Sequence, residues 1–197
     1  MKIFSTVLGA FFIAALIVGG WAVKKYNGLI AGREMVNTSW AQVESQYQRR
    51  MDLVPNLVET VKAAGKFEKD TLTAVVDARS RVGSLNMGKD ALNDPEAFRK
   101  FESAQAGLSS ALSRLLVVVE KYPDIKATQG YRDLQVQLEG TENRIAVARR
   151  DFNESAQSYN TSIKVFPALL VANFGGFKER PYFAAAPEAA AAPAVKF

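Results

Sequence analysis

The chain has 197 residues, with 25 Lys and Arg against 20 Asp and Glu, and it contains neither cysteine nor histidine. The lack of cysteine excludes disulfides, zinc–thiolate sites and cysteine nucleophiles, and the lack of histidine removes the commonest general base and metal ligand. The net charge of +5 comes from charges of both signs interleaved along the chain. No basic stripe interrupted by aromatic residues stands out, so we expect no nucleic-acid binding.

The chain begins with an uncharged apolar run over residues 3–23, between Lys2 and the pair Lys24-Lys25. At ~1.5 Å per residue, a helix of this length spans a hydrocarbon core ~30 Å thick. The alternative is a cleaved signal peptide, for which residues 20–22 offer a cleavage site flanked by small residues. The length of the run and the double lysine after it favour an uncleaved transmembrane anchor.

The residues around the end of this run have the chemistry of a membrane interface. They are Trp21, Lys24, Lys25 and Tyr26. Basic residues are in excess on the C-terminal flank, where Arg33 follows the two lysines, and the flank with this excess faces the cytoplasm. We therefore expect a single-pass protein whose helical domain lies in the cytoplasm.

Beyond the anchor, apolar residues recur at three- and four-residue steps, the period of amphipathic helices. The predicted helices cover residues 29–47, 57–82, 94–122 and 131–166. Pro55 lies near the start of the second helix, where a missing N–H costs little; the alternative is a proline kink in one longer helix. Asp94 as N-cap and Pro95 at the first helical position mark the start of the third helix.

These elements predict an all-α fold. We expect a transmembrane anchor over residues 1–25, followed by an elongated antiparallel up-down helical bundle over residues 26–167. Short connections make sequential helices antiparallel, and four apolar stripes in one chain can cover one another. A dimeric coiled coil is the alternative architecture.

The remaining residues, 168–197, form an apolar segment and then an Ala/Pro-rich tail with the composition of a linker. The apolar segment is expected to lie back on the bundle or on the membrane interface. Four apolar or aromatic side chains suit insertion into a groove of another protomer or protein, namely Tyr182, Phe183, Val195 and Phe197. The alternative is an inert solubilising tail.

Several motifs together resemble those of the LemA family of bacterial membrane proteins. Arg49-Arg50 followed by Asp52-Leu53-Val54-Pro55-Asn56-Leu57 is the most specific block, and residues 138–146 (Leu-Glu-Gly-Thr-Glu-Asn-Arg-Ile-Ala) also agree. The similarity extends over essentially the whole chain. It implies a single N-terminal span in the bacterial cytoplasmic (inner) membrane followed by an antiparallel helical domain, but it implies no chemistry.

The polar residues of these motifs are the sharpest site candidates. They are Arg50, Asn56, Glu68, Arg79, Glu142, Asn143, Arg149, Asn153 and Asn160. They form either a charged pocket or partner surface, or a hydrogen-bonded network that fixes the register of long helices, and buried charges that need partners favour the network. Glu139 and Glu142 lie three residues apart, but without histidine we expect no metal site, no cofactor and no catalytic residue.

The resulting functional hypothesis is a non-enzymatic scaffold or adaptor that is anchored in the lipid bilayer and self-assembles. Its partners are expected to be further copies of the chain and another protein of the cell envelope. The resemblance also implies an alternative, a regulatory or recruiting subunit for a membrane enzyme such as an envelope protease. A third alternative is a ligand-binding protein that uses the Arg and Glu residues of the motifs.

Overall fold

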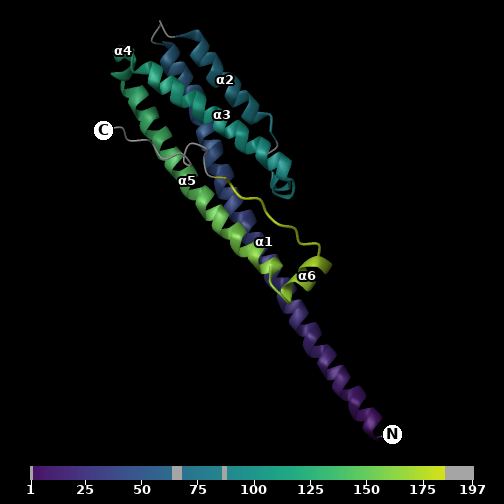
Figure 1. Ribbon diagram of the computed structural model, residues 1–197. Helices are drawn as coiled ribbons and strands as arrows, with labels where there is room; N and C mark the ends of the chain where they lie inside the picture. The colour runs from purple at the N-terminus through teal and green to yellow at the C-terminus, as the bar shows by residue number, and fades with distance from the viewer. Residues whose placement is uncertain (1, 64–67, 86–87, 185–197) are drawn as a thin grey trace, which may run out of the picture.

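The computed structural model describes residues 2–63, 68–85 and 88–184. They form α-helices and a short 3₁₀ helix, with no strand in these ranges: α1 (Lys2–Ala63), α2 (Lys69–Gly83), η1 (Lys89–Asn93), α3 (Pro95–Val119), α4 (Pro123–Lys126), α5 (Gln129–Lys164) and α6 (Ala168–Phe174). Figure 1 shows an elongated bundle from which α1 projects toward the N-terminus. The predicted all-α fold is confirmed.

The longest element, α1, joins the apolar N-terminal run to the bundle without a break. Its most apolar window has a mean hydropathy of 2.2, and none of that window is buried. Within the described residues it is the one helix long and apolar enough to cross a membrane. Tyr26-Asn27-Gly28, which follows the double lysine, is helical as well.

Pro55 does not start a helix, so that prediction is wrong, and the alternative of one longer helix that contains the proline is the one found. It lies inside α1, which continues to Ala63, and α2 begins only at Lys69. A proline has no N–H to donate to the carbonyl four residues earlier, here that of Met51. The Nε of Arg79, on α2, donates to this Met51 oxygen at 3.1 Å instead. The neighbouring helix thus satisfies the group that the proline leaves free, and α1 can run through it.

The bundle consists of two antiparallel helix pairs, α1 with α5 and α2 with α3. The predicted start of α3 is confirmed, because the Asp94 carboxylate accepts hydrogen bonds from the N–H groups of Glu96 (2.8 Å) and Ala97 (3.3 Å). Pro123 begins the single turn α4, and Thr128 caps the start of α5. These caps and the proline therefore mark where the chain turns and a new helix begins.

The buried side chains form two cores that follow each other along the bundle axis. The membrane-proximal core is rich in aromatic residues, including Trp40, Tyr47, Phe98, Phe101, Phe152, Tyr159 and Phe183. The distal core is mostly aliphatic, including Val54, Leu57, Val61, Val75, Leu108, Leu115 and Leu138. The stripes predicted from the sequence supply both cores.

After α5 the chain turns through α6 and returns along the bundle. Ala168 and Ala172 of α6 are buried against α1 and α5. Residues 177–184, which we call the strap, then run without helix toward the middle of the bundle. The apolar segment thus lies back on the bundle, whereas Val195 and Phe197 fall outside the described residues.

Candidate functional site: a buried arginine layer and a clamped strap

A buried arginine joins three helices at one level of the bundle. The side chain of Arg50 on α1 is 1% exposed. Its Nη1 donates to Ser109 Oγ at 2.6 Å and to Glu142 Oε1 at 3.0 Å, and its Nη2 donates to the side chain and the backbone carbonyl of Gln105. We call Arg50, Gln105, Ser109 and Glu142 the arginine layer.

The arginine layer lies where the two cores meet. On α1, Tyr47 belongs to the aromatic core and Met51 to the aliphatic core, so Arg50 lies between them. On α3, Gln105 separates Phe101 from Leu108 in the same way. A buried guanidinium needs hydrogen-bond and charge partners at its own level of the bundle. Sliding one helix by a turn would leave the Arg50 charge buried without them. The arrangement favours the register-fixing interpretation of the sequence motifs.

Two asparagines on α5 hold the strap by its backbone. Asn160, which is 2% exposed, accepts from the N–H of Arg180 and donates to its carbonyl, both at 2.8 Å. Asn153 makes the same pair of bonds with Phe183, at 2.9 and 3.0 Å. The asparagines are seven residues apart on the helix, whereas their partners are three apart on the strap. Seven residues of helix rise ~10 Å, and three extended residues span about the same length. The two asparagines on α5 therefore hold the strap in an extended conformation.

An ion pair secures the end of the strap. Arg149 on α5 contacts Glu102 on α3 at 3.0 Å and donates to the carbonyl of Ala184 at 2.9 Å. Glu102 in turn accepts from the Ala184 N–H at 3.1 Å. The Arg149 guanidinium also lies 4.5 Å from the ring centre of Phe183. This pair therefore ties α3, α5 and the strap together.

Phe183 completes the membrane-proximal core. Its ring centre lies 4.9 Å from that of Phe98, 5.5 Å from Phe152 and 6.1 Å from Trp40. The neighbouring Tyr182, also a candidate for docking, is exposed. Of the four tail residues singled out in the sequence, Phe183 is thus buried in its own chain's bundle.

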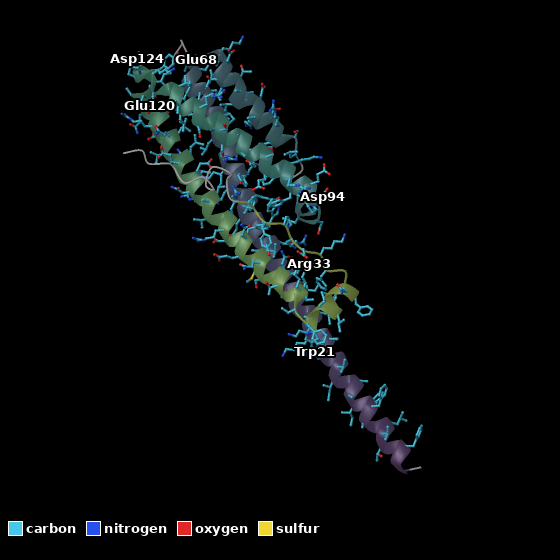
Figure 2. The ribbon with its side chains drawn as sticks, viewed as in Figure 1. Trp21, Arg33, Glu68, Asp94, Glu120 and Asp124 are labelled. Atoms are coloured by element: carbon cyan, nitrogen blue, oxygen red, sulfur yellow. The ribbon has the colours of Figure 1, made fainter. Side chains whose placement is uncertain are left out.

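The other candidate residues lie apart from these clusters. Asn56 and Asn143 are exposed on α1 and α5, Glu68 precedes α2 and accepts from Thr71 Oγ1 at 3.3 Å, and Arg79 supports the Pro55 turn. In Figure 2, Trp21 lies at the end of the bundle from which the N-terminal part of α1 projects, and Glu68 lies at the opposite end. The nine motif residues therefore make several separate contacts rather than one site.

A cleft of about 350 Å³ lies between the arginine layer and the end of the strap. Arg50, Arg99 and Arg149 line it together with Glu102 and Glu142. Burial raises the pKa of the adjoining Tyr47 above its usual 10.0, outweighing the opposite effect of Arg149 and Arg50. The phenol is therefore protonated at neutral pH and is unsuited to act as a base there. Across the described ranges, no group of three or more His, Cys, Asp or Glu could hold a metal ion.

Sequence reasoning overlooked Glu102, Ser109 and Arg180. Gln105, the one polar member of an apolar stripe, was the available signal for the arginine layer, and Ser109 lies one turn further on. Arg180 is 8% exposed, and its Nη1 donates to Asn93 Oδ1 at 2.5 Å. Burial lowers its pKa. No periodicity marks Arg180, since it lies outside any helix.

The chain is similar in sequence to one protein family and to several known proteins. The LemA family model matches residues 39–197. Magnetosome protein MamQ 2 of Paramagnetospirillum magneticum is 30% identical over 189 residues, covering 87% of this chain and 67% of the relative. Magnetosome protein MamQ of Magnetospirillum gryphiswaldense is 29% identical over 177 residues (81% and 64%). Protein LemA of Metamycoplasma hominis is 22% identical over 144 residues (73% and 62%). The chain thus spans about two thirds of the length of these relatives.

Proposed function

This chain belongs to the LemA family, and from that premise we propose that it is a membrane-anchored helical adaptor without enzymatic activity of its own. In this proposal the anchor assembles with further copies, and the bundle holds another protein of the cell envelope. The observation that carries the proposal is an open groove along α1 and α5, the helix that leaves the membrane and its antiparallel neighbour.

The groove has the character of a helix-packing surface. It encloses about 610 Å³ and is lined by Thr38, Ala41, Gln42, Ser45, Gln46, Asn143, Arg144, Val147, Ala148 and Asp151. Small side chains such as Ala41, Ser45 and Ala148 allow another helix to approach closely.

A second copy of the chain suits this groove. Two copies anchored in one bilayer with the same orientation are related by an axis along the membrane normal, which runs nearly parallel to α1. Such a two-fold axis brings the same face of each copy together. The α1/α5 faces of two copies would then form a four-helix arrangement.

Single cysteines test the self-assembly directly, because the chain contains no cysteine of its own. Ser45→Cys places a thiol in the groove, and the matched Ser80→Cys places one on the exposed surface of α2. A short bis-maleimide added to native membranes should link Ser45→Cys chains into dimers and leave Ser80→Cys monomeric. Equal yields from both variants would contradict assembly through the groove.

The proposed cytoplasmic position of the bundle has its own test. Ser80→Cys should react with a membrane-impermeant maleimide in inverted membrane vesicles and be protected in intact spheroplasts. The reverse pattern would place the bundle outside the cytoplasm, and the candidate partners would then be periplasmic proteins.

A further inference from the structure

The turn after α5 and the helix α6 expose an unusual concentration of large apolar side chains. Phe166 is 79% exposed, Leu170 52% and Phe174 95%. Leu170 and Phe174 are four residues apart on α6 and so share a face, whereas the small Ala168 and Ala172 face the bundle and are buried. In a helix that served only the bundle, large residues would be inside. An outward apolar face of this kind marks a contact with something outside the chain.

The register of α1 against α5 fixes the height of this surface. Ser39 Oγ and Ser155 Oγ lie 2.8 Å apart across the two antiparallel helices. Phe166 comes eleven residues after Ser155, so it lies near the level of Gly28, eleven residues before Ser39. The apolar run of α1 ends at Val23, five residues or ~8 Å below that level.

The far end of α6 lies at the same height. The rings of Tyr26 and Phe177, the first residue of the strap, are 5.4 Å apart, which places the chain just after α6 beside Tyr26. A side-chain carbon at Gly175 would lie 3.1 Å from the Tyr26 ring and 2.5 Å from that of Phe177, so glycine is needed for this approach. Both ends of the surface thus lie within three to five residues of Val23. Figure 1 shows α6 on one side of α1, near the point where α1 leaves the bundle.

We infer that Phe166, Leu170 and Phe174 insert into the headgroup region of the bilayer that α1 spans. The interfacial layer on each side of the hydrocarbon core is ~5–8 Å thick, so the surface lies at its outer edge and its aromatic side chains reach into it. Lys24 and Lys25, exposed just below, add attraction to anionic headgroups. Because α6 lies on one side of α1, its insertion favours a tilt of α1 toward that side.

This inference rests on the membrane anchoring in the proposed function, but not on self-assembly or on a protein partner. It is tested with the full chain reconstituted in phosphatidylcholine/phosphatidylglycerol vesicles. Leu170→Cys and Phe174→Cys carry an environment-sensitive NBD label on the α6 surface. Val136→Cys, also an exposed apolar position but near the other end of α5, is the matched control. All three side chains are exposed, so the substitutions should preserve the fold.

Labels at positions 170 and 174 should emit at shorter wavelength than the label at 136. They should also be quenched by lipids brominated near the headgroup end of the acyl chain more than by lipids brominated near its terminus. Quenching no greater than at position 136 would overturn the inference. A blue shift that lacks lipid quenching and disappears below one copy per vesicle would also overturn it, since a second copy would then cover the surface. Either result leaves the Ser45→Cys cross-linking test of the proposed function intact.

Discussion

Replacing Asn160 with alanine should release the strap from the bundle while leaving the bundle folded. The Asn160 amide is the buried end of the clamp, with two 2.8 Å bonds to the backbone of Arg180. Alanine keeps the helix and removes both bonds. The strap then depends on Asn153, on Arg149 and on the ring of Phe183.

The size of the effect follows from these bonds. A hydrogen bond contributes about 0.5–1.5 kcal/mol net, so two contribute about 1–3 kcal/mol to strap docking. Since 1.4 kcal/mol is about a factor of ten in an equilibrium constant, the fraction of undocked strap should rise roughly five- to hundredfold. In the variant the strap can move into solvent, where water pairs with the N–H and carbonyl of Arg180. The larger free-energy cost of keeping these two groups buried without partners is therefore avoided.

Hydrogen exchange of backbone amides measures this opening, because an amide exchanges at a rate set by its local opening equilibrium. The amides of Arg180 and Phe183 donate to Asn160 and Asn153, so both should exchange faster in Asn160→Ala by the factor above. Amides in the middle of α5 should be unaffected. Asn143→Ala, an exposed asparagine on the same helix, is the control and should change neither set. Unchanged exchange at Arg180 in Asn160→Ala would refute the clamp.

Three further outcomes follow from buried groups, each measured on the full chain in detergent. Arg79→Ala should lower the free energy of unfolding by about 2 kcal/mol in denaturant titrations. The loss should be clearly smaller in a Pro55→Ala background, because the restored N–H of residue 55 then donates to the Met51 carbonyl in place of the arginine. Equal losses in the two backgrounds would contradict this compensation. Glu142→Ala removes the carboxylate partner of the buried Arg50. Because the Glu142 side chain is 44% exposed and Arg50 keeps Ser109 and Gln105, the loss should be about 1–2 kcal/mol by the same measurement, and a change below about 0.5 kcal/mol would argue against a structural role. Burial raises the pKa of Tyr47, so the folded state keeps a proton that the unfolded state releases above pH ~10. The melting temperature should therefore fall as the pH rises beyond that point, and it should fall less steeply in Tyr47→Phe. Parallel profiles of melting temperature against pH for the two proteins would show that Tyr47 does not contribute.

The helices could be predicted because their signals are local. The apolar stripes, the cap at Asp94 and the uncharged run before Lys24 each depend on residues within a few turns of one another. The course of α1 through Pro55 could not be predicted in the same way. Its compensating donor, Arg79, is 24 residues later and on another helix, so no local rule connects the two.

The polar sites show a similar division. Arg50 stands beside an apolar stripe, where a charged residue is as readily solvated as buried, and only the packed bundle shows it to be 1% exposed. Asn153 and Asn160 were recognised as candidates, but their partners are backbone groups of the strap, which carry no side-chain signature. The sequence therefore identified the residues without their partners.

The unbroken course of α1 sets how far the bundle reaches from the membrane. From Val23 to Ala63 the helix rises ~60 Å, so the end of the bundle that carries α4 stands far beyond the headgroups. A rigid rod of that length acts as a lever, and a tilt of about 20°, ordinary for a membrane helix, moves its tip sideways by ~20 Å. A protein bound at the tip would thus be positioned over a wide area of membrane by small rotations at the anchor.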